Sequence, residues 1–242
     1  LGQGFAKSFG ISFLDESSKQ KIPWQNSWGI STRLIGAVVM MHGDDKGLVL
    51  PPRISAVKGV IIPLFFENKK SDVRKEAKKI HALLSKSNNV VLDDRENYSP
   101  GWRFSEWELK GIPIRIEIGP KDLEKSQVIM VRRDTGKKEQ VKFSQIEKKF
   151  FALLNEIQSD MLKRAKKILK DSIVESDSYS EFKDLINKRK IAKVNFCGKA
   201  SCEEKIKSET SATSRCIAKE SKGMCICCGN EAKINIYFSR SH

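Results

Sequence analysis

One arginine near the start of the sequence has neighbours that suit it to phosphate or base binding. Arg33 follows Ser31 and Thr32 and precedes the apolar run 34–41. A guanidinium is planar and always charged, so one held on a buried floor can direct a fixed cation at a phosphate or stack on a base. A buried arginine can also cap a core helix without binding any ligand. These residue types alone favour that structural role, so the flanking sequence must decide.

Six cysteines gather after position 196, and four of them form two close pairs. Cys197 and Cys202 have four residues between them, and Cys225 and Cys228 have two. Four thiolates in two pairs suit a closed, tetrahedral structural zinc site. Disulfides are the main rival, and they require an oxidising compartment. Cys227 competes with Cys228 as the fourth ligand, and we choose Cys228 because Gly229 follows it as in a zinc knuckle.

The overall composition favours an anionic partner. The 242 residues include 45 Lys+Arg against 30 Asp+Glu, a formal net charge of +15. Such an excess favours nucleic acid first and an acidic membrane surface second, although a general lysine bias gives the same number. No apolar run is long enough to span a bilayer. The length allows more than one domain.

The middle of the chain alternates strand-like and helix-like patterns. Apolar runs predict strands over 60–66, 90–92, 112–118 and 127–132. Helices are predicted over 71–87, with an apolar face of Val73, Ala77, Ile80, Leu83 and Leu84, and over 102–110. Ser144 and Glu147 predict a capping box, which opens a long helix with a stripe of Phe151, Leu154, Ile157, Met161 and Ile168. This order indicates an α/β layer around a mixed sheet.

The two ends of the chain differ from this middle part. Residues 31–41 are apolar after a start of small residues and predict a buried helix, and residues 48–50 predict a short strand. Near the other end, Ser178 and Glu181 predict a helix cap for a helix to about residue 190. A strand is predicted over 191–196.

The early stretch resembles a family motif. Gly29-Ile-Ser-Thr-Arg-Leu-Ile-Gly36 resembles the third signature motif of class II aminoacyl-tRNA synthetases, and the run from Gln25 to Arg53 resembles its prolyl version. The resemblance implies that Arg33 is catalytic and holds ATP, with Ser31 also at the nucleotide. It also suggests a proline pocket lined by Ser27, Trp28 and Gly29, although core packing accounts for Trp28 equally well.

A second resemblance covers Tyr98-Ser-Pro-Gly-Trp-Arg-Phe-Ser-Glu-Trp-Glu-Leu-Lys-Gly-Ile-Pro-Ile-Arg115 and the segment 117–122. Both resemble the anticodon signature of the prolyl enzymes. The resemblance implies that Glu108, Arg115 and Lys121 contact two anticodon guanines. Arginine can donate two parallel bonds to guanine, and glutamate can accept from guanine N1–H and N2–H₂. A surface ion-pair network is the alternative that the residues alone would favour.

The last segment resembles the C-terminal zinc unit of archaeal/eukaryotic-like prolyl-tRNA synthetases, which implies zinc on Cys197, Cys202, Cys225 and Cys228. Cys216 matches a family position that is not a ligand. Relatives end in tyrosine, whereas this chain ends in His242. We therefore expect three parts: the end of a class II antiparallel-sheet catalytic domain (1–55), an α/β anticodon-binding domain (56–155) and a small α+β zinc-binding domain (156–242).

These resemblances imply the function. The sequence begins at Leu1 within a motif, so we expect the C-terminal portion of a cytoplasmic prolyl-tRNA synthetase, a ligase of protein biosynthesis. The implied ligands are ATP with Mg²⁺, L-proline, tRNA(Pro) and structural zinc, and the full-length protein is expected to be a homodimer without membrane association. The alternative is a non-catalytic, synthetase-like RNA-binding or accessory protein.

Overall fold

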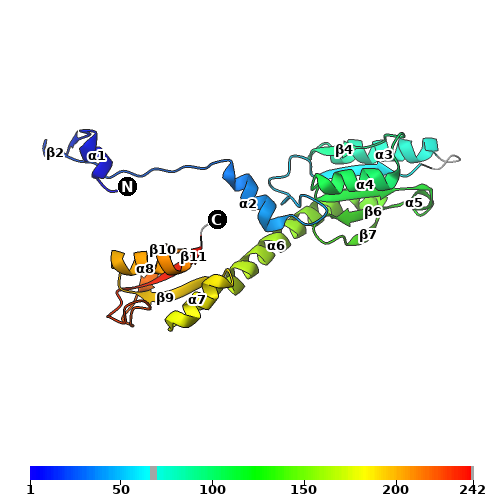
Figure 1. The fold of residues 1–242 in the computed structure, drawn as a ribbon. Coiled ribbons are helices and arrows are strands. Elements are labelled where there is room, and N and C mark those ends of the chain that lie inside the picture. Colours follow the sequence, from blue (N-terminus) through cyan, green and yellow to red (C-terminus); the bar gives the residue numbers. More distant parts are fainter. Residues whose placement is uncertain (66–69, 241–242) are drawn as a thin grey trace. The chain divides into compact units, whose positions relative to one another are not determined.

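The computed structural model describes residues 1–65 and 70–240, and these divide into two compact units. The first unit comprises residues 1–150 and the second residues 151–242. Figure 1 shows the elements of both. None of the helices in the described ranges is both long enough and apolar enough to cross a membrane.

A five-stranded mixed sheet organises the first unit. Its strands are β3 (Gly59–Pro63), β4 (Val90–Leu92), β5 (Ile114–Ile118), β6 (Gln127–Arg132) and β7 (Lys138–Lys142). They lie in the order β4-β3-β5-β6-β7, and β3 is parallel to β4 and β5 while β6 is antiparallel to its neighbours. All residues of β3 and β5 are buried. The predicted mixed sheet is confirmed.

Helices cover both faces of this sheet. The chain passes from β3 through α3 (Lys70–Leu84) outward to β4, then through α4 (Pro100–Leu109) back across β3 to β5. Right-handed crossovers in opposite directions place α3 and α4 on opposite faces. On the α4 face, Phe104 and Trp107 pack against Val60 and Ile62. On the other face, Phe150 of α6 (Ile146–Ser172) lies against Gly59.

Several local predictions about this unit are wrong. Residues 48–50 are not a strand, because the Leu48 and Leu50 N–H groups donate to the carbonyls of Leu109, the last residue of α4, and of Gly111 in the following turn (3.0 and 3.4 Å). Ser144 is not a helix cap, since it lies within a 3₁₀ turn before α6. On α6 the predicted stripe is confirmed at Leu154, Ile157 and Met161, which are buried, and wrong at its two ends, because Phe150 is buried in place of Phe151 and Ile168 is exposed.

Three further elements of the first unit can be compared with the predictions. Strand β7 was not predicted, because in this edge strand Val141 is the one buried residue. The burial of α3 agrees with the predicted face, with Val73, Ala77, Ile80 and Leu84 buried. Strand β3 ends at Pro63, and the end of the predicted strand at Phe66 lies outside the described residues.

The N-terminal segment contains α1 (Gly4–Ser8), the antiparallel pair β1 (Phe13–Leu14) and β2 (Gln20–Lys21), and α2 (Arg33–His42). The helix predicted over 31–41 exists, but its predicted burial is wrong, because none of the α2 residues is buried. The reason is that the described residues offer this apolar helix no covering surface, so Leu34, Ile35 and Met40 are exposed.

The second unit has its own sheet and core. The strand order is β10 (Ala212–Glu220), β11 (Ile234–Arg240), β9 (Ile191–Phe196), β8 (Ile173–Glu175), with only β8 and β9 parallel. Helices α7 (Tyr179–Asn187) and α8 (Ala200–Thr210) precede β9 and β10. Phe182 and Phe196 meet Phe238 edge to face. Ser178 accepts from the Glu181 N–H (3.1 Å), so the predicted cap is confirmed, although the helix ends at Asn187.

The close approach of α6 to β3 gives a stability prediction. A Cβ at Gly59 would lie 2.7 Å from Phe150 Cε2 and 3.3 Å from the Ile114 carbonyl oxygen. Gly59→Ala should therefore lower the free energy of unfolding by about 1–3 kcal/mol, the usual cost of overpacking. Gly101→Ala is the matched control, because nothing lies within 4 Å of its Cβ position, and its stability should stay the same or rise by up to about 1 kcal/mol. Equal stabilities in urea titrations would contradict the packing described here.

Candidate functional site

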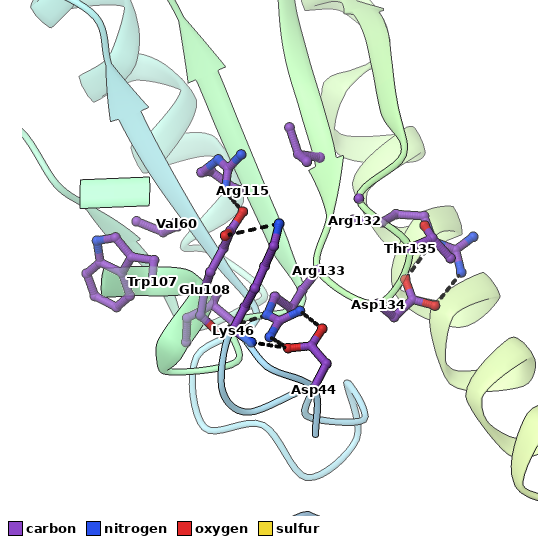
Figure 2. Close-up of a pocket in the computed structure, with 13 residues that line it drawn as sticks. Asp44, Lys46, Val60, Trp107, Glu108, Arg115, Arg132, Arg133, Asp134 and Thr135 are labelled. Carbon is purple, nitrogen blue, oxygen red and sulfur yellow. Dashed lines mark hydrogen bonds and ion pairs between the residues drawn. The ribbon is translucent and has the colours of Figure 1, made fainter. Parts of the chain in front are cut away.

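A cavity of about 220 Å³ opens beside the amino end of β5. Its wall combines the end of α4, the start of β5, the turn after β6 and the loop that follows α2. Figure 2 shows that charged side chains from these four segments converge on it. The charged residues that line it are Asp44, Lys46, Glu108, Arg115, Arg132, Arg133 and Asp134. Such a mixture of fixed donors and acceptors suits a polar, planar ligand better than an apolar one.

Arg115 is the centre of this wall. Its Nε donates to Glu117 Oε1 and its Nη1 to Glu108 Oε1, both at 2.9 Å. Its guanidinium carbon also lies 4.3 Å from the centre of the Phe104 ring. The side chain is only 10% exposed. Two carboxylates and one ring therefore hold this guanidinium in a single orientation.

A second arginine supports the first from the neighbouring strand turn. The Arg133 Nε donates to the Glu108 carbonyl oxygen (2.9 Å), and its two Nη atoms donate to the Asp44 carboxylate (2.7 and 2.6 Å). Lys46 Nζ lies 3.8 Å from Glu108 Oε2. These contacts, drawn in Figure 2, tie the loop after α2 to the end of α4.

The charges around Glu108 keep it ionised. Burial raises the pKa of Glu108, but the hydrogen bond from Arg115 and the nearby charges of Arg115, Lys46 and Arg133 outweigh burial and lower the pKa below its usual range. The hydrogen bond from Arg133 likewise lowers the pKa of Asp44 to about 2. At neutral pH the cavity therefore presents an anionic acceptor at Glu108 beside a cationic donor at Arg115.

The structure brings Glu108 and Arg115 together, but Lys121 lies elsewhere. Lys121 is exposed in the short helix α5 (Pro120–Glu124), which follows the carboxyl end of β5. Arg133 lies at the opposite, amino end of β5, where its backbone N–H donates to the Pro113 carbonyl. A ligand that touched all three predicted residues would have to extend along β5.

The four cysteines predicted to bind metal also meet. The sulfur atoms of Cys197, Cys202, Cys225 and Cys228 all lie within 4.8 Å of one another. Cys197 Sγ is 3.6 Å from Cys202 Sγ and 3.8 Å from Cys228 Sγ. A tetrahedral zinc site with bonds of about 2.3 Å has sulfur–sulfur edges of about 3.8 Å. The donor set therefore fits a zinc ion.

Backbone geometry selects Cys228 rather than Cys227 for this cluster. Gly229 has a left-handed φ of +71°, and its N–H donates to the Cys225 carbonyl (2.9 Å), which closes a tight turn. Cys227 packs against the apolar core of the unit instead. Burial raises the pKa of Cys202 and of Cys225, whereas the Asn230 N–H lowers the pKa of the exposed Cys228 to about 7.

The residues predicted to hold ATP and proline lie in the N-terminal segment. Ser31 and Arg33 are exposed at the start of α2, and Ser27, Trp28 and Gly29 are exposed just before it. None of the five lines the Arg115 cavity. Their roles therefore stay predictions.

Comparisons with known proteins match both units. Residues 58–153 match the anticodon binding domain family, and residues 179–242 match the family described as prolyl-tRNA synthetase, C-terminal. Together the two matches correspond to the C-terminal region of prolyl-tRNA synthetases. The anticodon domain match contains the Arg115 cavity wall from Val60 to Gly136, and the C-terminal match contains all four clustered cysteines.

Curated relatives agree with this assignment. All of this chain aligns with a proline–tRNA ligase from Natranaerobius thermophilus at 44% identity, one from Oceanobacillus iheyensis at 43% and one from Clostridium botulinum (strain Loch Maree) at 44%. The chain spans about half the length, 51%, of each of these prolyl-tRNA synthetase relatives.

Sequence reasoning missed several residues of the cavity. Glu117, which holds Arg115 without lining the cavity, was recoverable, because it lies two positions from Arg115 on a strand and therefore on the same face. Asp44 and Arg133 were not recoverable, since they are 89 positions apart and no local pattern connects them.

The Asp44–Arg133 pair gives a prediction about pH. Because the pKa of Asp44 falls from 3.8 to about 2 in the folded protein, the pair stabilises the fold above about pH 4 and this contribution is lost as the pH falls towards 2. Asp44 is 46% exposed, so Asp44→Asn should cost less than about 1 kcal/mol at pH 5, and this cost should shrink towards zero as the pH falls to and below the folded pKa of about 2. Urea titrations across this range measure the difference, with Asp45→Asn as the neighbouring control. A pH-independent cost would show that the amide side chain destabilises the fold by other means.

Proposed function

We propose that this chain supplies the anticodon-reading and C-terminal modules of a prolyl-tRNA synthetase, which activates L-proline with ATP and transfers it to tRNA(Pro). The observation that carries the proposal is the Glu108–Arg115 pair in the cavity of the anticodon-binding domain. The pairing at 2.9 Å and the similarity of the whole chain to proline–tRNA ligases support it.

The geometry suits an unpaired guanine. Arg115 uses Nε and Nη1 within the protein, which leaves Nη2 to donate to a guanine O6 or N7 acceptor. Glu108 accepts from Arg115 through Oε1, so Oε2 can accept from the guanine N1–H or N2–H₂. Single-stranded bases splayed from a loop are what proteins read in RNA. Lys121 follows the carboxyl end of β5, and in this proposal it contacts a neighbouring nucleotide.

The proposed activation step uses the N-terminal segment. Arg33 and Ser31 would bind ATP, and Ser27, Trp28 and Gly29 would line the proline pocket, as the motif resemblance implies. Mg²⁺ bound with ATP would neutralise phosphate charge. Arg33 contributes a fixed positive charge at the phosphates, so the protein acts by positioning and charge stabilisation. The full-length enzyme is proposed to be a cytoplasmic homodimer, with domain limits near residues 55 and 155.

A structural zinc ion is proposed for the second unit. Cys197, Cys202, Cys225 and Cys228 would hold it, which supplies a cross-link between the end of β9, the start of α8 and the loop before β11. The sulfur–sulfur distances of 3.6 and 3.8 Å support this assignment. A closed site of four thiolates leaves no open position for catalysis.

A double-mutant cycle, which combines a substitution in the protein with a base replacement in the RNA, tests whether Glu108 reads guanine. Inosine lacks the guanine 2-amino group, so replacing the anticodon guanine that Glu108 reads should weaken tRNA(Pro) binding about tenfold. Glu108→Gln should cause a similar loss with the natural tRNA and little further loss with inosine. Glu139→Gln is the matched control. Glu139 lies on strand β7 and forms a 2.7 Å ion pair with Lys149 of α6, and it does not line the cavity. Additive losses from both changes would contradict direct contact, and absent binding of tRNA(Pro) would contradict the function.

Zinc content is tested by substituting single cysteines. The purified chain should contain one zinc per molecule, measured by mass spectrometry of the metal, and Cys197→Ser should lose it and unfold at a lower temperature. Cys216→Ser and Cys227→Ser should retain zinc, because Cys216 is exposed and neither belongs to the cluster. Zinc that survives Cys228→Ser but not Cys227→Ser would reverse the ligand assignment.

A further inference from the structure

A second cavity lies at the other end of the first unit's sheet. Its volume is about 280 Å³, and its wall includes Phe65 after β3, Arg95 and Tyr98 after β4, and Arg103 of α4. The chain leaves β3 towards α3 and leaves β4 towards α4, which lie on opposite faces of the sheet. Ligands of open α/β sheets bind where adjacent connections diverge in this way, outside the carboxyl ends of the strands.

Two stacked rings stand beside this cavity. The Tyr98 and Trp102 ring centres are 4.0 Å apart with an angle of 14° between the planes. Tyr98 is 37% exposed and Trp102 is 45% exposed. A pair that served only to pack the core would be buried, so the exposed ring surface is available to a ligand.

Arg95 fixes these rings from the loop after β4. Its guanidinium carbon lies 5.0 Å from the Tyr98 ring centre and 5.4 Å from that of Trp102. Two bonds of 2.8 Å join Arg95 to the buried Asp93 carboxylate, which also accepts from Trp107 Nε1 (2.7 Å). Arg95 therefore has a rigid support, and we call Tyr98, Trp102 and Arg95 the aromatic platform.

The cations that form ion pairs around the aromatic platform are outnumbered by their carboxylate partners. The cations Lys70, Arg74 and Arg95 form ion pairs with the carboxylates of Asp93, Asp94, Glu96 and Glu106. Free positive charge for a phosphate is therefore scarce here, in contrast to the +15 of the whole chain. The platform offers flat ring surface and a cation beside it, which bind the π-face of a base in any sequence context.

We propose that the aromatic platform stacks an unpaired base of the bound RNA, next to the guanines read at Glu108 and Arg115. This site rests on the proposed function and extends it. Trp102 and Glu108 are six positions apart on α4, about 9 Å along the helix axis, so one anticodon loop can reach both. Lys121 follows the carboxyl end of β5, at the same end of the sheet as the platform, which gives the RNA a continuous path.

The test measures binding of the 242-residue chain to tRNA(Pro) transcripts that carry one abasic position in the anticodon loop. Trp102→Ala should weaken binding of the intact tRNA about tenfold, as expected for one lost base stack. Trp102→Phe should restore most of the affinity, because it keeps a ring. One abasic position should cost the wild type about the same, and the Trp102→Ala variant almost nothing more.

Two further measurements distinguish stacking from other causes. The slope of log affinity against log salt should be unchanged in Trp102→Ala, because phosphate contacts set that slope. A fluorescent purine analogue at the sensitive position should be quenched by the wild type and Trp102→Phe but not by Trp102→Ala. Ile217→Ala, which removes another exposed apolar side chain, is the control and should bind normally.

Each remaining outcome overturns the proposal. Wild-type affinity in Trp102→Ala, with normal binding by the wild type, refutes the platform and leaves the guanine site intact. The proposal is also refuted if the affinity loss in Trp102→Ala adds to the loss caused by an abasic site at every position tested. It is refuted as well if the affinity loss in Trp102→Ala comes with a changed slope of log affinity against log salt. Failure of the wild-type chain itself to bind tRNA(Pro) refutes the proposed function, and the platform with it.

Discussion

The buried Arg115 guanidinium is the constraint on which the first unit's site depends. Removing a cation from water costs several kcal/mol unless carboxylates compensate it, and here Glu108 and Glu117 do so at 2.9 Å. The two partners come from the end of α4 and from β5 itself. Satisfying this one charge therefore fixes the position of α4 on the sheet and, at the same time, fixes the donors and acceptors that face the cavity.

Polar contacts hold helix α4 in place along its whole length. Ser99 caps its first turn by accepting from the Trp102 N–H (3.3 Å). In the middle, buried Arg103 donates to the Pro63 and Asp93 carbonyls (3.0 and 2.7 Å), which binds the helix to the carboxyl ends of β3 and β4. At its end, the Glu108 carbonyl accepts from Arg133. Polar anchors, rather than apolar packing alone, set the register of this helix, so its functional side chains are held before any ligand arrives.

In the second unit, four cysteines bring separate segments together. Its sheet and its three-phenylalanine contact form the core, while the cysteine cluster joins segments that the strands alone do not connect. Cys197 follows the end of β9, Cys202 lies in the first turn of α8 and the other two lie before β11. The zinc ion proposed for this cluster would cross-link these segments and stabilise a small unit whose apolar core is limited. In both units, groups distant in sequence converge because backbone elements position them.

The sequence by itself determined the alternation of strands and helices, the Ser178 cap and the gathering of the cysteines after position 196, because each leaves a local pattern of spacing or residue type. Glu108 and Arg115 were singled out by the resemblance of their segment to a family signature. Only the tertiary structure decided that Asp44 meets Arg133 across 89 positions, that Phe150 rather than Phe151 faces Gly59, and that Cys228 rather than Cys227 joins the cluster. These outcomes depend on which surfaces meet after folding. A local pattern can restrict a helix face to within one residue, but the fit against a distant segment selects the side chain that is buried.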